Sequence, residues 1–301
     1  MKIKTQYYGT DKLRSYRYYR DITSRYFVWQ INENNSTWCF LDNMLTAHLI
    51  HAAQIKTALD LGSYLGMLPL FTEDILKTGE SDNQLQTAWT LVDNFSFLND
   101  LSKAINDSTY RTTEQALVAQ IEPWKNLNIE WAKTLTPELL PPTNPNNLAK
   151  FHDTIISYYN SPRPKISGML TDINEVSGKF DLIHFDLSAS RYIVNKTILE
   201  KVVNLHLNNN GIIIFDDVKT ATPAQLSLFF YAIQELNLYP VAFSQTKAAC
   251  IKANDNEEKE RLLINLKSRL VLSQDSISES YDWVLESTPE FGNYLKLRTS
   301  K

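Results

Sequence analysis

Acidic residues follow five apolar segments of this 301-residue chain, at places where side chains could bind a ligand or carry out chemistry. The acids are Asp60, Asp93, Asp172, Asp186 and the adjacent pair Asp216 and Asp217. Two carboxylates close together repel by about 1 kcal/mol in water, and by several times that when partly buried. The pair after GIIIF therefore implies either a solvated turn or a partner that is positive or donates hydrogen bonds.

The segments that carry these acids have the pattern of strands in one sheet. Near-continuous apolar strands alternating with helices are typical of a parallel sheet covered on both faces. The sequence therefore predicts an α/β fold with a doubly wound, mostly parallel, seven-stranded Rossmann-like sheet. The expected strands are 57–63, 86–95, 164–173, 180–186, 211–217, 239–245 and 247–253, and the expected helices between and after them are 64–77, 147–159, 190–207, 223–238 and 256–272.

Three parts of the chain are additions to this sheet. Residues 1–55 are predicted to form an N-terminal helical cap before a Rossmann-like domain over 56–255. About seventy residues separate the second and third strands, whereas a crossover needs about a dozen, so roughly 98–146 is an insertion. Residues 256–301 are predicted to form a C-terminal helical extension and tail.

The turn after the first strand limits the choice of cofactor. It reads DLGSYLG and lacks both the G-x-G-x-x-G of dinucleotide-binding proteins and the Gly-Lys-Ser/Thr of a P-loop. Asp60 would also repel a pyrophosphate, which argues against a nicotinamide oxidoreductase. An acid at this place suits a cationic ligand, and Asp93 after the second strand suits ribose hydroxyls.

Taken together, these motifs resemble those of class I S-adenosylmethionine-dependent methyltransferases. ALDLGSYLG corresponds to the cofactor turn, TLVDNF to the ribose-binding motif, and KFDLIHFD and LNNNGIIIFDDV to the fourth and fifth strands. YPVAFSQ and KAACIKA correspond to the closing pair of strands. The chain looks most similar to the branch that contains macrocin-type and catechol-type O-methyltransferases, many of which use Mg²⁺. The resemblance covers about residues 40–98 and 146–254.

The resemblance implies a role for each matching residue. Gly62, Ser63 and Gly66 would let the methionine part of S-adenosylmethionine approach the backbone, and Asp60 would lie near its amino group. Asp93 would accept the ribose hydroxyls, and Asp172 would lie near the adenine amine.

The same resemblance implies a metal site and leaves the base open. Mg²⁺, which prefers oxygen ligands, would be held by Asp186, Asp216 and Asp217. The two adjacent acids can reach one ion only if the chain turns there, since consecutive strand residues point to opposite faces. The loop DLSASRY after Asp186 lacks the histidine found in relatives, so Asp186 and Lys219 are the candidates for the catalytic base.

The histidines are expected to be structural. His184 is predicted to be a packed core residue within the fourth strand, and His152 and His206 to lie on helices.

Composition and net charge indicate which binding partners and locations are expected. The net charge of −4 makes nucleic acid an unlikely partner. No stretch is long enough to span a membrane, and Cys39 and Cys250 suggest free thiols. We expect a cytoplasmic protein that methylates a small hydroxylated molecule, such as a sugar or natural product. A protein methyltransferase, and a methyltransferase-like protein that binds without catalysis, stay open, as does a homo-oligomer.

Overall fold

The fold is described here from a computed structural model of the chain. It describes residues 45–47, 49–50, 53–76, 86–95, 136, 139–141, 144–159, 163–187, 196–216, 233–243, 247–269 and 284–285. The predicted N-terminal cap and insertion fall almost entirely outside these residues. In the described part of the chain, no helix is long and apolar enough to cross a membrane.

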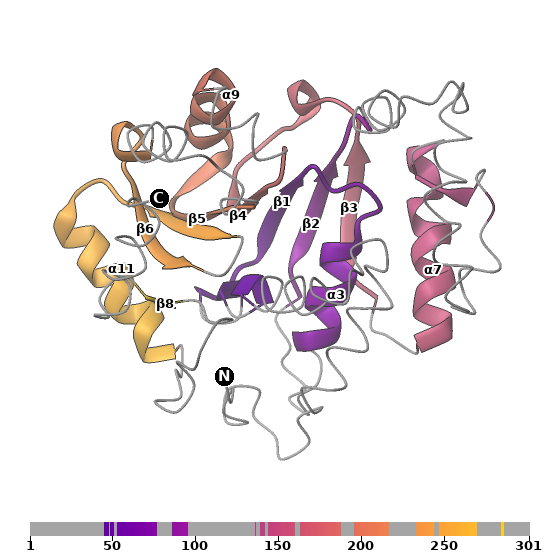
Figure 1. The fold of residues 1–301 in the computed structure, drawn as a ribbon, viewed down its shortest axis with the longest axis horizontal. Helices are drawn as coiled ribbons and strands as arrows, with labels where there is room; N and C mark the ends of the chain where they lie inside the picture. Colours follow the sequence, from indigo (N-terminus) through magenta and orange to yellow (C-terminus); the bar gives the residue numbers. More distant parts are fainter. Residues whose placement is uncertain are drawn as a thin grey trace, which may run out of the picture.

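One mixed sheet forms the centre of the protein (Figure 1). Its order is β3-β2-β1-β4-β5-β7-β6-β8. The pairs among β1 to β5 are parallel, and the pairs β5–β7, β7–β6 and β6–β8 are antiparallel. The strands are β1 (Thr57–Leu61), β2 (Ala88–Val92), β3 (Lys165–Leu170), β4 (Phe180–Phe185), β5 (Leu207–Phe215), β6 (Leu238–Phe243), β7 (Ala248–Lys252) and β8 (Val284–Leu285). The α/β Rossmann-like prediction is confirmed, and the C-terminal extension adds the short β8.

Helices flank the sheet, with α7 at its β3 end and α11 at its β6 end (Figure 1). The helices are α3 (Met67–Leu76), α7 (Leu148–Tyr159), α9 (Lys196–Lys201) and α11 (Asn256–Arg269), with 3₁₀ turns at Pro145–Asn147 and Ile173–Glu175. Pro69 falls in the first turn of α3, where its missing N–H leaves no hydrogen bond unmade.

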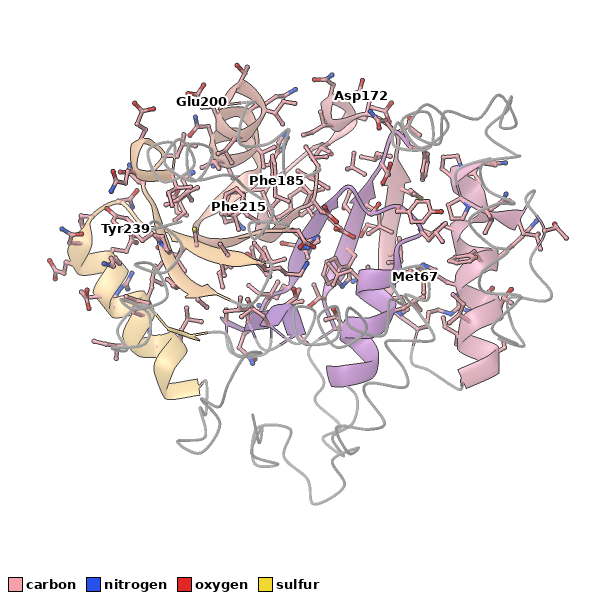
Figure 2. All side chains as sticks on the ribbon, in the orientation of Figure 1. Met67, Asp172, Phe185, Glu200, Phe215 and Tyr239 are labelled. Carbon is pink, nitrogen blue, oxygen red and sulfur yellow. The ribbon has the colours of Figure 1, made fainter. Side chains whose placement is uncertain are left out.

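A core cluster of apolar residues lies between the sheet and α9. Leu59, Ile183 and Ile213 alternate with residues of the opposite face and pack with Leu199 and Val203. Phe185 and Phe215 lie in the same cluster, with ring centroids 5.7 Å apart (Figure 2). Because side chains alternate along a strand, this packing leaves Asp60 and His184 on the other face.

The entry into β5 differs from the prediction. The expected helix over 190–207 ends as α9 at Lys201, and a π-helical turn (Val202–His206) leads directly into a strand that begins at Leu207. Leu207 pairs with Phe180, and the register then shifts before Ile212 pairs with Leu182. The polar run Asn208–Asn210 is the irregular part of this strand, which is why the sequence pattern indicates a loop there.

A single carboxylate joins three strands at the edge opposite to the predicted site. Asp181 Oδ2 accepts hydrogen bonds from the backbone N–H groups of Lys56 and Thr57 and from the Thr57 hydroxyl, at 3.1–3.2 Å. Asp181 Oδ1 accepts one from Asn208 Nδ2 at 2.8 Å. These contacts tie β4 to the starts of β1 and β5.

Candidate functional site

The residues that follow the parallel strands form one continuous edge. Each donates its backbone N–H to the last residue of the neighbouring strand: Gly62 to Val92, Asp93 to Leu170, Asp186 to Leu61 and Asp216 to Phe185, at 2.8–3.1 Å. Three of the predicted acids, Asp93, Asp186 and Asp216, therefore lie along the carboxyl edge, where open α/β sheets bind ligands.

The turn after β1 needs glycine at its first position. Gly62 has φ +85°, and a Cβ there would lie 1.7 Å from the carbonyl oxygen of Asp186. The turn therefore packs directly on the backbone that follows β4, leaving no room for a side chain. This close packing is why the sequence motif requires glycine here.

The second half of the turn is held by α7. His152 Nε2 donates to the carbonyl oxygen of Leu65 at 3.2 Å, and a Cβ on Gly66 would lie 3.1 Å from the same nitrogen. Burial lowers the pKa of His152 to about 4, so it is neutral and structural, as expected. His206 likewise contacts a backbone carbonyl, that of Gly178, at 3.1 Å.

Ser63 carries a polar atom suited to a ligand. Its side-chain oxygen is buried, and within the described residues it has no hydrogen-bond partner. A buried hydroxyl without a partner costs free energy unless a ligand or water satisfies it. This hydroxyl lies in the turn that the resemblance assigns to the cofactor.

Asp93 organises the loops on either side of it. Its Oδ2 accepts the N–H of Tyr64, and its Oδ1 accepts the N–H of Phe95, both at 2.6 Å. Tyr64 and Phe95 both adopt positive φ, which is uncommon for residues other than glycine. Burial raises the pKa of the Asp93 carboxyl, although these two hydrogen bonds act to lower it. Each oxygen has a second lone pair, which can accept a hydrogen bond from a ligand hydroxyl such as that of a ribose.

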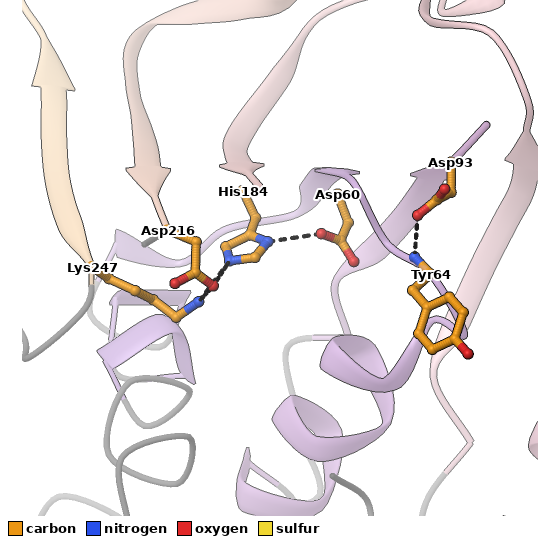
Figure 3. A network of polar contacts seen from close by, with 6 residues as sticks. All are labelled: Asp60, Tyr64, Asp93, His184, Asp216 and Lys247. Carbon is orange, nitrogen blue, oxygen red and sulfur yellow. Dashed lines mark hydrogen bonds and ion pairs between the residues drawn. The ribbon is translucent and has the colours of Figure 1, made fainter. Parts of the chain in front are cut away.

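A chain of four polar side chains extends from β1 to β7 (Figure 3). Asp60 Oδ1 lies 2.8 Å from His184 Nδ1, and His184 Nε2 lies 2.8 Å from Lys247 Nζ. Lys247 also forms an ion pair with Asp216 Oδ2, which lies 3.4 Å from His184 Nε2. The side chains of Asp60, His184 and Lys247 are at most 5% exposed, whereas that of Asp216 is 17% exposed. A ligand would therefore meet this chain at Asp216.

The carboxylate of Asp60 sets the role of one imidazole nitrogen of His184. A carboxylate only accepts, so His184 Nδ1 carries a hydrogen and donates it to Asp60. Burial and the charge of Lys247 lower the pKa of His184, but hydrogen bonds to Asp216 and Asp60 outweigh them and raise it. His184 Nε2 lies 2.8 Å from Lys247 Nζ and 3.4 Å from Asp216 Oδ2, so the imidazole and the lysine both face this carboxylate.

The pKa of Asp216 is held well below its usual range. Burial acts to raise it, but the Lys247 ammonium and His184 outweigh that effect. Asp216 is therefore an ionised hydrogen-bond acceptor. Buried Lys247 is therefore the positive partner of Asp216 in the acid pair.

His184 is buried within β4, as predicted, and its ring belongs to this polar network. The reason is register: His184 pairs with Asp60 across β1 and β4, so the two side chains point to the same face.

Lys247 belongs to the site but is not among the residues predicted from the sequence, although the direction of β7 indicates where it lies. Because β7 is antiparallel to β5, its amino end lies where the parallel strands have their carboxyl ends. Phe215 pairs with Ala248, so the next residues along, Asp216 and Lys247, face each other.

The remaining predicted site residues are placed as follows. Asp172 follows β3 on the surface, where its Oδ1 caps the 3₁₀ turn by accepting the N–H of Asn174 at 2.8 Å. Asp186 is partly buried after β4. Asp217 and Lys219 lie outside the described residues.

The described residues do not fit a Mg²⁺ site. Among them, no group of three histidine, cysteine or acidic side chains could hold a metal ion. The carboxylate of Asp216 instead pairs with the Lys247 ammonium.

Comparisons with known proteins find similarity in structure only. No protein-family model matches the chain, and no curated protein matches it in sequence. A ribosomal protein L11 methylase from Lactobacillus delbrueckii subsp. bulgaricus matches 72% of this chain and 78% of its own, with 15% identity and a TM-score of 0.35. A putative O-methyltransferase from Klebsiella pneumoniae matches 79% and 90%, with 12% identity and a TM-score of 0.38. An SAH-bound methyltransferase from Podospora anserina matches 79% and 88%, with 11% identity and a TM-score of 0.38. Values of this size do not bear on the reaction, so the function is argued from the residues of the site.

Proposed function

We propose that the protein is an S-adenosylmethionine-dependent methyltransferase. The observation that supports this most is the turn after β1, where Gly62 packs on the backbone of Asp186, together with Asp93, which follows the neighbouring strand β2. The strand order, with β7 between β5 and β6, agrees with the closing pair expected for class I methyltransferases.

Each part of the cofactor has a residue to hold it. The glycine turn would admit the methionine part, with the Ser63 hydroxyl as a donor or acceptor beside it. Asp93 would accept the ribose hydroxyls, and Asp172 would lie toward the adenine. When bound, S-adenosylmethionine supplies a methyl group on a sulfonium, and the site's main contribution is to position the acceptor in line with it.

We propose a small hydroxylated molecule as the acceptor. Asp216 offers an ionised carboxylate at the exposed end of the network, and an acceptor hydroxyl can donate to it. Asp186, in the neighbouring loop, is the candidate to receive the proton that the hydroxyl loses; Lys219 stays the second candidate.

A ligand-binding protein without catalysis is the second candidate function. It is favoured by one observation, namely that Lys247 engages both Asp216 and His184, so that neither serves as a catalytic base. The two functions differ in whether methyl transfer follows cofactor binding.

Calorimetric titration with S-adenosylmethionine and S-adenosylhomocysteine tests the proposal. We expect saturable binding by the unmutated protein and a loss of tenfold or more in Asp93→Ala, because each good hydrogen bond to a charged group contributes about 1.5–3 kcal/mol. Asp153→Ala, which removes an acid about half exposed on α7, serves as the control and should bind normally. Absence of binding by the unmutated protein would refute the proposal. Binding without transfer to a panel of sugars, phenols and peptides would favour the second candidate.

A further inference from the structure

We infer that Lys247 provides, from within the chain, the positive charge that a divalent metal would provide beside Asp216, so that the acceptor side of the site works without a metal ion. The inference depends on the proposed function only for the role of this site in methyl transfer. The occupation of Asp216 by a lysine is independent of it.

Lys247 engages the groups that a metal would use. Its Nζ contacts Asp216 Oδ2 and lies 2.8 Å from His184 Nε2. A carboxylate oxygen and an imidazole nitrogen are both good ligands for divalent cations. A metal placed between them would displace the ammonium or lie against it, and two like charges at that distance repel strongly.

The fold holds Lys247 in this position. Its backbone continues β7, which pairs with β5 on one side and β6 on the other. Its side chain is 3% exposed, so the ammonium cannot turn into water without leaving both partners. Lys252, at the other end of the same strand, instead donates to the carbonyl oxygen of Val203 at 2.8 Å.

A fixed cation beside Asp216 suits a reaction in which an oxygen atom accepts the methyl group. A hydroxyl that loses its proton during methyl transfer gains negative charge, and the carboxylates of Asp60 and Asp216 would oppose this. The positive charge of Lys247, which is paired with Asp216, offsets part of that field and is already in place before the reaction, which is the condition for electrostatic stabilisation.

Metal binding to matched lysine variants tests the inference. Mn²⁺ binding is measured by electron paramagnetic resonance, and the melting temperature with Mg²⁺ or Mn²⁺ by circular dichroism. For the unmutated protein we expect no saturable Mn²⁺ binding up to 1 mM and no change in melting temperature with EDTA. In Lys247→Ala, Asp216 and His184 should together bind one Mn²⁺ and raise the melting temperature by about 2 °C when free Mn²⁺ is at ten times the dissociation constant.

Two further variants serve as controls. Lys252→Ala also removes a lysine from β7 but uncovers no carboxylate contact of this kind, so it should behave as the unmutated protein. Asp216→Asn added to Lys247→Ala should abolish the metal response. Saturable Mn²⁺ binding by the unmutated protein that Asp216→Asn removes would overturn the inference, as would the absence of any response in a folded Lys247→Ala protein.

A substitute variant and a second measurement keep the outcomes distinct. If Lys247→Ala does not fold, it is replaced by Lys247→Met, which retains most of the side-chain volume. The Mn²⁺ test on the unmutated protein does not depend on either variant. Calorimetric titration with S-adenosylmethionine in EDTA separates this inference from the proposed function. Unimpaired cofactor binding alongside a tight Mn²⁺ site would overturn the inference alone, and absent cofactor binding would overturn the proposed function alone.

Discussion

Replacing Gly62 by alanine should unfold the edge of the sheet that carries the site, and Gly178 provides a matched control. The two glycines have nearly equal φ, +85° and +83°. They differ in surroundings: a Cβ at Gly62 would lie 1.7 Å from the Asp186 carbonyl oxygen, whereas one at Gly178 would have nothing within 4 Å. The pair therefore separates backbone strain from steric exclusion.

The expected change in the free energy of unfolding has three contributions. A non-glycine residue in the left-handed region costs about 1–2 kcal/mol, and alanine recovers about 0.4–1 kcal/mol by restricting the unfolded chain. Gly178→Ala should therefore destabilise by at most about 1.5 kcal/mol. In Gly62→Ala the turn must also move off β4, which breaks the 2.8 Å hydrogen bonds from Gly62 to Val92 and from Asp186 to Leu61. Each buried group left unpaired costs about 1–3 kcal/mol, so we expect an additional 2–6 kcal/mol.

Urea unfolding followed by circular dichroism measures both variants. The midpoint of Gly62→Ala should fall well below that of Gly178→Ala, with an unchanged slope if both unfold in two states. A Gly62→Ala protein that is recovered unfolded beside a native Gly178→Ala protein gives the same answer. Equal free energies of unfolding, within about 0.5 kcal/mol, would show that the turn does not pack on the Asp186 backbone as described.

Two further changes test how the elements are held together. Asp181→Ala should lower the free energy of unfolding by about 2–4 kcal/mol, because it removes the acceptor of four hydrogen bonds. As a control, Asp153→Ala, in an exposed ion pair, should lower it by less than about 0.5 kcal/mol. Equal losses for the two variants in urea unfolding would contradict the role of Asp181 in joining the strands. His152 has a pKa of about 4 in the folded protein and about 6.5 when unfolded, so the unfolded chain binds more protons between these values and stability falls as the pH is lowered through them. Relative to His152→Gln, the unmutated protein should lose up to about 3 kcal/mol from pH 7 to pH 4, and parallel pH profiles of the two would refute the assignment of a neutral, buried His152.

The sheet could be predicted where local pattern and tertiary pairing agree. The strands predicted at 57–63 and 180–186 form at Thr57–Leu61 and Phe180–Phe185, because each is an apolar run closed by glycine or aspartate. The start of β5 could not be predicted, since three asparagines indicate a loop when read locally. Leu207 enters the sheet only through its pairing with Phe180, which is 27 residues away in the sequence.

The site could be predicted as a row of backbone positions, but its side-chain network could not. Asp60 near the end of β1, Asp93 after β2 and Asp186 after β4 could be found because each immediately follows an apolar run. His184 and Lys247 depend on which strands are neighbours and on their relative direction. A lysine before an apolar strand usually lies in solvent, and only the antiparallel direction of β7 turns it toward Asp216.

The place of β7 in the sheet also has a consequence for synthesis. It is the last of the seven main strands in the chain, yet it lies between β5 and β6. At about 5–20 residues per second, the 37 residues from Phe215 to Lys252 take about 2–7 s to emerge from the ribosome after β5 has done so. During that interval the apolar run Ile212–Phe215 has no partner on one side, and an open apolar edge is a site of aggregation. Pairing of β7 with β5 therefore covers the open edge of β5. The same step brings Lys247 next to the carboxylate of Asp216.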